Sequence, residues 1–380
     1  MSTDLIQKAS QNIQDILKYS IKFDPAIHSS LVVFDTQDEL TKIITAAYKI
    51  ALPGAKFLDF DTTDKQQIIA EFDALKPYDL VILIQTGSFR LDEFRIRIHL
   101  FNHKLKVIEH LHLYRNEQKT WPIYVDSLAY DPTWYGKMGV ALQDRLANCE
   151  TLVIRTSNNF EPTNQVDGNA NTPETLVPPI YSGDSFGKST ANYDVSKTST
   201  VSQVTVTGGL EIPKLNTGDY TGMVNVGGTF PIGEVFTESK VLENLNGSFW
   251  VYAFANEKFE IMMPEIFEVN IVNGLVDSWS KNAPKEFISV IENIKLQERA
   301  IVREIGFGLN RAMSKTLPLG DITAFERIVG VHLSIGEKHS VYSKADITKH
   351  KARFHVDLFL QTKQVLVDGQ VIFEDGAYLV

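Results

Sequence analysis

The stretch 78–84 constrains the fold of the N-terminal part most strongly, because its last five residues, Leu80 to Ile84, are all apolar. A short continuous apolar run is typical of a strand buried on both faces, as the strands of parallel sheets are. Segments 31–35 and 55–60 also predict strands, and 107–113 is a candidate fourth. Apolar residues at helical spacing predict helices at 4–19, 37–51 and 64–75. Strands that alternate with helices predict a doubly wound, Rossmann-like α/β domain over residues 1–150.

Residues 151–380 predict a second domain, of mixed α+β type with antiparallel strands. The apolar segment 266–272 is followed by Asn273-Gly274, which is a strong hairpin signal. From about 157 to 202 the chain is rich in Asn, Thr, Ser, Gly and Pro, and this predicts a long loop or an insertion with short strands. The remaining predicted elements are a strand at 152–156, strands at 204–210, 223–226 and 249–254, a turn at 230–234, and helices at 131–150 and 284–299.

Composition excludes several classes of function. The 380 residues carry a formal net charge of −10, and an acidic surface argues against non-specific binding to nucleic acid or to anionic membranes. No apolar run of about 18 residues is present, so no membrane span is expected. The N-terminus lacks the pattern of a signal peptide, and the one cysteine, Cys149, allows no internal disulfide. We therefore expect a cytoplasmic protein.

Candidate metal ligands are concentrated between Glu304 and Asp357. His355 and Asp357 are two residues apart in a predicted strand, 354–360, so their side chains project to the same face. His332 lies in another apolar run, and Glu304 precedes two glycines where backbone can approach a site closely. A set of His, Asp and Glu without thiolate suits zinc, manganese, cobalt or iron(II). The same residues are also compatible with hydrogen-bonded histidines of a protein core, and spacing alone does not decide between the two.

Four short motifs stand out in the C-terminal half. They are Gly233-Glu234-Val235-Phe236, Glu304-Ile305-Gly306-Phe307-Gly308, Val331-His332-Leu333-Ser334-Ile335-Gly336 and Phe354-His355-Val356-Asp357. These motifs resemble those of the thermophilic metallo-aminopeptidase family, the aminopeptidase T and aminopeptidase S type. Their order and approximate spacing both match the family, and the resemblance is best over about 227–380.

The resemblance implies that residues 151–380 form a metallopeptidase-like domain that holds two divalent ions (Zn, Co or Mn), with one carboxylate bridging them. It further implies an aminopeptidase that removes N-terminal residues from short peptides through a metal-activated water, and a homodimer. Glu304 is the residue that the resemblance suggests for taking the proton of the water. The implied metal ligands are Glu234, Glu304, His332, His355 and Asp357.

The sequence departs from the family pattern at two positions. The family has a tyrosine seven residues after its first histidine, whereas this chain has His339 there, and its nearest tyrosine is Tyr342. His339 either replaces that tyrosine as a ligand or hydrogen-bond donor, which makes it a candidate catalytic residue with Glu304, or it lies on the surface. Arg303 stands where the family often has glycine.

Two other functions remain open at this point. The aminopeptidase-like superfamily, to which the resemblance points, also resembles the ring-cleaving dioxygenases of 2,5-dihydroxypyridine degradation. In those enzymes two histidines and one aspartate hold a single iron(II). His332, His355 and Asp357 would supply that set here. The third possibility is a relative that binds a partner without catalysis. Metal analysis separates the first two, because the peptidase needs two ions per chain and the dioxygenase needs one iron.

Overall fold

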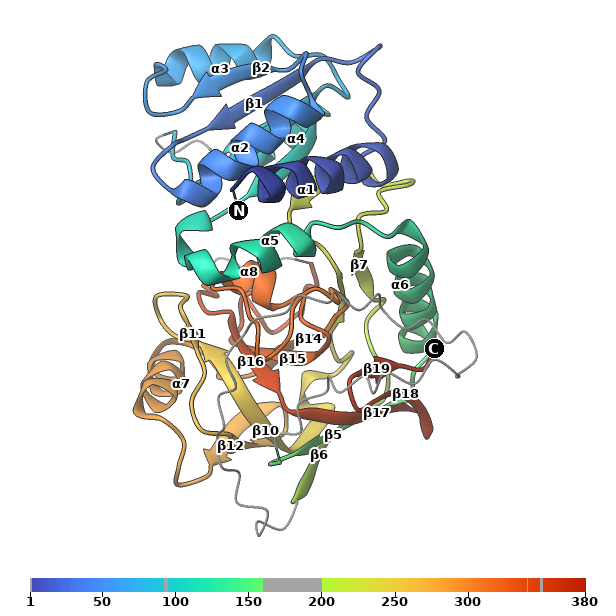
Figure 1. Cartoon of the computed structure of the whole chain (residues 1–380). Coiled ribbons are helices and arrows are strands. Elements are labelled where there is room, and N and C mark those ends of the chain that lie inside the picture. The colour runs from blue at the N-terminus through green and yellow to red at the C-terminus, as the bar shows by residue number, and fades with distance from the viewer. Residues whose placement is uncertain (1, 92–94, 160–199, 340, 349–350) are drawn as a thin grey trace.

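A computed structural model of the chain describes residues 2–91, 95–159, 200–339, 341–348 and 351–380. Figure 1 shows two sheets, one in the upper and one in the lower half of the molecule. In the described residues the first sheet has five strands, all parallel. Their order is β2 (Lys56–Asp59), β1 (Ser30–Phe34), β3 (Leu80–Ile84), β4 (Lys106–His110) and β8 (Gly227–Thr229).

Helices cover both faces of the parallel sheet. They are α1 (Ser2–Asp15), which continues into a π-helical turn (Ile16–Ser20), α2 (Glu39–Ala51), α3 (Lys65–Asp73) and α4 (Ile96–Asn102). Ile82 of β3 belongs to an apolar cluster with residues of α1 and α2, whereas its neighbour Val81 belongs to another cluster with residues of α3 and α4. Successive strand residues face opposite sides, so the continuous apolar run at 80–84 reflects a strand buried on both faces.

The second sheet is antiparallel and curled, and within the described residues it has 14 strands. Its main path runs β19 (Ala377–Tyr378), β18 (Gln370–Glu374), β17 (Thr362–Val367), β5 (Thr151–Ser157), β6 (Val201–Thr207), β10 (Leu245–Ala255), β16 (Val356–Leu360), β15 (Gly330–Ile335), β14 (Val302–Gly308), β9 (Glu234–Thr237) and β7 (Lys214–Asn216). Off this path lie β11 (Ile261–Met262), β12 (Phe267–Val272) and β13 (Leu275–Trp279).

Further helices pack around the second sheet and between the two sheets (Figure 1). They are α5 (Trp121–Ser127), α6 (Pro132–Ala147), α7 (Lys285–Gln297) and α8 (Ile322–Phe325), with 3-10 turns at Leu113–Arg115, Gln118–Thr120 and Leu242–Asn244. One apolar cluster extends from α1 through α5 and α6 into strands of the second sheet. Strand β8, which follows residue 150 in the chain, pairs with β4 of the first sheet. The two sheets therefore share one apolar core, and the second part of the chain contributes strand β8 to the first sheet.

The predicted fold class, an α/β doubly wound part followed by a mixed α+β part, is confirmed. The hairpin at Asn273-Gly274 joins β12 to β13, and both turn residues have positive φ. The strand predicted at 223–226 is wrong, since those residues form a bend without regular structure and the strand begins at Gly227. Of the polar stretch predicted at 157–202, residues 160–199 lie outside the described residues. No helix in the described ranges has the length and apolar character needed to cross a membrane.

His110 of β4 is a polar side chain in the core of the first sheet, and both of its ring nitrogens have hydrogen-bond partners. The ring is fully buried, with Nε2 2.9 Å from the hydroxyl of Tyr48 and Nδ1 2.8 Å from the hydroxyl of Tyr124. Burial lowers the pKa of His110 from 6.5 to about 3, because the charged ring would lose its hydration. His110 therefore stays neutral in the folded protein.

We expect this histidine to make folding sensitive to acid. Below pH 6.5 the unfolded chain binds a proton that the folded chain does not, so the free energy of unfolding falls progressively as the pH drops toward 3. The His110 contribution is a loss of about 2 kcal/mol between pH 7 and pH 5. Urea unfolding of the wild type and of His110→Gln at both pH values measures it. An equal loss in the two proteins would contradict the assignment.

Candidate metal centre

Four neighbouring strands, β9, β14, β15 and β16, bring the predicted ligands to one face of the second sheet. In β14, Glu304 is paired with Ser334 of β15, and Ser334 is paired in turn with Asp357 of β16. Two residues further along β14, Gly306 is paired with His332, and after two more Gly308 is paired with Glu234. Paired residues and residues two apart share a face of a sheet. The other face of β14, with Ile305 and Phe307, packs into the core.

Gly306 makes room for the imidazole of His332. A Cβ at position 306 would lie 2.1 Å from Cε1 and 2.2 Å from Nε2 of that ring, so any side chain there would collide with it. The absence of a side chain lets the ring lie directly over the backbone of β14. From this position Nε2 of His332 lies near the carboxylates of Glu304 on β14 and of Glu234 on β9, the strand beyond β14.

Glu234, Glu304 and His332 form the first group of ligand atoms. Nε2 of His332 lies 3.2 Å from Oε1 of Glu234 and 3.5 Å from Oε1 of Glu304. All three residues are buried, yet Nε2 of His332 and Oε1 of Glu234 make no hydrogen bond. Buried polar atoms are normally satisfied, and two such atoms that face each other without a hydrogen bond are suited to a shared cation.

Glu304, His355 and Asp357 form the second group. Nε2 of His355 lies 3.4 Å from Oδ1 of Asp357 and 4.0 Å from Oε1 of Glu304. In each group the ligand atoms lie within 4.8 Å of one another. Glu304 belongs to both groups, and its Oε1 is the oxygen that faces both His332 and His355. Carboxylate oxygens and imidazole nitrogens without sulfur suit a divalent metal such as zinc, manganese or cobalt.

Hydrogen bonds from outside the groups orient two of these ligands. His355 ends the loop that leads into β16, one residue before the strand begins, and its Nδ1 donates to the carbonyl oxygen of Lys338 at 3.0 Å. That bond leaves the Nε2 lone pair directed at the second group. The hydroxyl of Ser334 donates to Oδ1 of Asp357 at 2.5 Å. Partners of this kind fix the orientation and tautomer of metal ligands in proteins.

His339 is buried and forms a hydrogen bond with the carboxylate of Glu304. Its Nδ1 accepts from the backbone N–H groups of Val341 and Tyr342, at 3.1 and 3.4 Å, so the ring proton lies on Nε2. Nε2 donates to Oε2 of Glu304 at 2.9 Å. A surface position, one of the alternatives left by the sequence, is therefore wrong, and His339 is a hydrogen-bond donor to Glu304 in this structure. The hydroxyl of Tyr342 donates to the carbonyl oxygen of Ile212 instead.

A buried guanidinium near the first group was not predicted from the sequence. Nη1 of Arg327 contacts Oε2 of Glu234 and lies 3.0 Å from Oε2 of Glu326. Since Arg327 occupies only Oε2 of Glu234, Oε1 of that carboxylate is left facing His332. The signal in the sequence was the charged pair Glu326-Arg327 between apolar residues, but nothing in its spacing indicated these partners.

A second buried arginine supports the loop that carries His339. Arg303 and Glu238 are each about 1% exposed, and Nε and Nη2 of the arginine donate to the two carboxylate oxygens at 3.0 and 3.2 Å. Nη1 and Nη2 also donate to the carbonyl oxygens of Glu337 and Tyr342, on either side of His339. The departure from glycine at position 303 thus has a structural role.

The carboxylates and histidines of the cluster change one another's pKa values. Burial alone would raise the pKa of Glu304, but His332 and His339 next to it lower the pKa below its usual range. Burial alone would lower the pKa of His332, but the carboxylates of Glu234 and Glu304 raise it well above its usual value. In both residues the ionised form is favoured, so without a metal a proton on His332 balances the carboxylates. Metal binding requires the loss of that proton.

The cluster opens into a cavity of about 1190 Å³. Its acidic side carries four of the five predicted ligands together with His339 and Glu326. Arginines from the first half of the chain line it as well: Arg90 and Arg95, which are exposed, and Arg115, which is held by Oδ2 of Asp321 at 3.0 Å. We call Arg90, Arg95 and Arg115 the basic wall. The cavity therefore has carboxylates and histidines on one side and guanidinium groups on the other.

No protein-family model matches this chain, and no curated protein matches it. A solved structure does: wild-type AmpT from Thermus thermophilus is similar to this chain with a TM-score of 0.56 and 9% sequence identity. The alignment covers 98% of this chain and 99% of that chain. Similarity at this identity is a similarity of fold over nearly the full length of both proteins.

Proposed function

We propose that this protein is a metal-dependent hydrolase of the aminopeptidase type, with two divalent cations bound between β9, β14, β15 and β16. The observation that carries the proposal is that Glu304 is common to two three-residue groups of ligand atoms beside a cavity of about 1190 Å³. The fold shared with AmpT, an aminopeptidase T, supports the same activity class. Glu234 and His332 would complete the first ion site, and His355 and Asp357 the second.

Two bound cations would polarise a peptide carbonyl and lower the pKa of a water molecule toward neutrality. The chain's own residues would position the reactants. His339 holds the carboxylate of Glu304 through its Nε2–H, which fixes the shared ligand. Glu326 lines the cavity, and burial together with the charges of Asp357 and Glu234 raises its pKa well above the usual value. We therefore propose that Glu304, which stays ionised, would take the proton of the water, and that Glu326, which keeps its proton, would donate a proton to the leaving amine.

The charge distribution in the cavity suits a short peptide with both ends free. An α-ammonium group is attracted to the carboxylates of the cluster, and an α-carboxylate is attracted to the exposed guanidinium groups of Arg90 and Arg95 in the basic wall. A cavity of about 1190 Å³ is larger than a typical small-ligand pocket of 300–1,000 Å³, so it has room for a few residues.

Arg90→Ala is expected to raise KM about tenfold for dipeptides with a free carboxylate, because a charge-assisted contact contributes about 1.5 kcal/mol. The corresponding dipeptide amides should show little change. Arg97→Ala is the matched control, since Arg97 pairs with Glu109 and does not line the cavity. Equal effects of Arg90→Ala on acids and amides would contradict the assignment of the basic wall.

His339 is expected to act through Glu304. His339→Phe removes the N–H donor, and we expect kcat/KM to fall about 10- to 100-fold, as for other partners that orient a metal ligand. His339→Gln can still donate to Oε2 of Glu304 and should recover most of the loss. Steady-state kinetics with KM and kcat resolved measures the effect. A Gln variant as impaired as the Phe variant would show that the ring matters for packing only.

Turnover tests the proposed activity directly. The metal-free protein is incubated with cobalt or zinc and assayed on a panel of aminoacyl-p-nitroanilides and dipeptides. We expect hydrolysis that requires added metal and that fails on N-acetylated substrates, which lack the free amine. Metal bound to the centre without hydrolysis of any member of the panel would reject the enzyme and favour a binding protein.

The mononuclear iron alternative is less well supported by the geometry. It needs His332, His355 and Asp357 around one ion, whereas the structure groups His332 with Glu234 and Glu304, and groups His355 with Asp357 and Glu304. The two histidines thus belong to different groups.

A further inference from the structure

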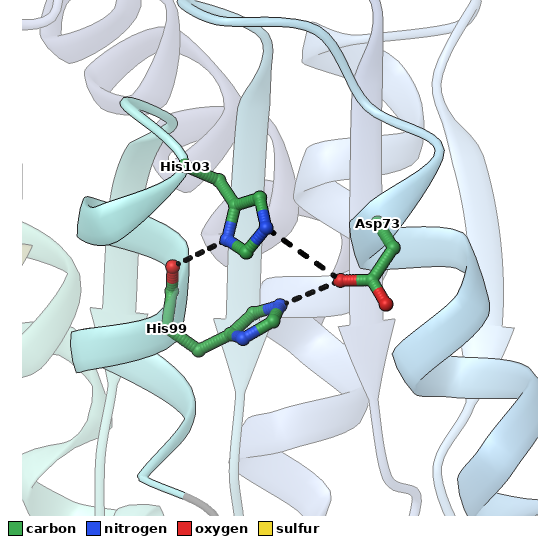
Figure 2. Close-up of side chains that lie close together, drawn as sticks. All are labelled: Asp73, His99 and His103. Carbon is green, nitrogen blue, oxygen red and sulfur yellow. Dashed lines mark hydrogen bonds and ion pairs between the residues drawn. The ribbon is translucent and has the colours of Figure 1, made fainter.

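A second candidate metal site lies on the helices that cover one face of the parallel sheet. Figure 2 shows His99 and His103 of the α4 region and Asp73 at the end of α3, with both imidazoles directed at the carboxylate. The ligand atoms of these three residues lie within 4.8 Å of one another. None of the three lines the cavity at the first metal centre. We propose that Asp73, His99 and His103, the surface triad, bind a divalent transition metal.

Helix geometry brings the two histidines together. His99 and His103 are four residues apart at the end of α4, and residues at this spacing are neighbours on a helix surface. Their ring centroids are 4.2 Å apart. Nε2 of His99 lies 2.8 Å from Oδ1 of Asp73, and Nε2 of His103 lies 3.9 Å from the same oxygen (Figure 2).

These separations fit the edges of a metal coordination shell. Zinc binds nitrogen and carboxylate oxygen at about 2.0–2.1 Å, so donor atoms around a tetrahedral ion are about 3.3 Å apart. The two measured separations, 2.8 and 3.9 Å, lie on either side of that value. A small rotation of the His103 side chain would place both nitrogens at bonding distance of an ion next to Oδ1 of Asp73.

A backbone contact sets the required tautomer of His103. Nδ1 of His103 lies 2.9 Å from the carbonyl oxygen of His99, and a carbonyl can only accept, so Nδ1 carries the proton. Nε2 then presents its lone pair to the triad. A ligand histidine whose other ring nitrogen donates to a backbone carbonyl is the usual arrangement in metal sites.

The surface triad is open to solvent, so a metal ion can reach it directly. The side chains of His99, His103 and Asp73 are 19, 43 and 50% exposed. Two imidazoles and one carboxylate are donors for zinc, nickel, copper or cobalt, and they leave a fourth position for water. A bound ion would cross-link α3 to α4, which pack on the same face of the sheet. Metal binding at the surface triad would therefore hold α3 and α4 together on this face of the first sheet.

The test measures zinc binding to the full-length protein by isothermal titration calorimetry after metal removal. We expect His99→Gln and His103→Gln each to lose one bound zinc per chain relative to the wild type, and Asp73→Asn to weaken that site about tenfold or more. His28→Gln is the matched control. His28 lies 3.6 Å from Oδ1 of Asp79, but that pair has no second histidine, and this variant should bind as the wild type does.

Crystals soaked in zinc give a readout that does not depend on the first metal centre or on peptidase activity. We expect an anomalous peak bounded by Asp73, His99 and His103. The proposal is overturned if wild type and both histidine variants bind equal numbers of ions, if zinc binds the triad only with Kd above about 1 mM, or if the soaked crystals show no peak there. Failure of peptide hydrolysis would leave these outcomes unaffected.

Discussion

Replacement of Glu304 by glutamine is expected to lower kcat/KM by about 10³-fold and to remove metal from both sites of the first centre. Glu304 is the one residue common to the two groups of ligand atoms, so its loss weakens both ions together. Two cations contribute several kcal/mol of charge stabilisation in the transition state, and each 1.36 kcal/mol corresponds to a factor of ten in rate. Glutamine keeps the shape of the side chain but not its charge.

The measurement combines steady-state kinetics with metal analysis of the variant. Glu257→Gln is the matched control, because Glu257 is a carboxylate that lines the same cavity but belongs to neither group and accepts from Asn293. We expect this control to keep its metal and its activity within about twofold. A Glu304→Gln variant with full metal content and full activity would remove Glu304 from the centre.

Replacement of Arg303 by methionine is expected to lower the free energy of unfolding by about 3 kcal/mol. The change leaves Glu238 buried opposite an apolar side chain and removes donors from the carbonyl groups of Glu337 and Tyr342. Breaking one partner of a buried ion pair typically costs about 3–5 kcal/mol. Burial already raises the pKa of Glu238, and Lys344 lies 3.5 Å from its Oε1, so we expect the lower end of that range.

The pH dependence of this loss follows from the same carboxyl group. Without Arg303 the folded-state pKa of Glu238 should rise further above its unfolded value, so the folded protein binds the additional proton. The destabilisation of Arg303→Met should therefore shrink as the pH falls from 7 to 5. Urea unfolding measures it. Arg299→Met is the control, since Arg299 is 35% exposed and its ion pairs should contribute less than about 1 kcal/mol. Equal losses in the two variants would contradict a special role for Arg303.

The sequence contained enough to predict the fold class and to find the candidate ligands. Strand Leu80–Ile84 was predictable because burial on both faces needs a continuous apolar run. Glu304, His332 and Asp357 were detectable because each is a charged or polar residue in an otherwise apolar strand of the second sheet. The structure brings them together through strand register, which the residues alone do not specify.

What could not be predicted depends on contacts between distant segments. Arg327 reaches Glu234 across 93 positions of the chain, and Arg303 reaches Glu238 across 65. Strand β8 joins the first sheet although its three residues, including two glycines, have almost no strand character. The sequence analysis did not single out His99 and His103, and their partner Asp73 comes from another helix. Such contacts follow from topology, and local patterns carry no signal for them.

Anomalous diffraction from crystals soaked with zinc tests the account of the first metal centre most directly, since it locates ions without reference to turnover. The account predicts two peaks on either side of the Glu304 carboxylate, one bounded by Glu234 and His332 and the other by His355 and Asp357. A single peak shared by both histidines, or no peak at this cluster in crystals saturated with zinc, would contradict it.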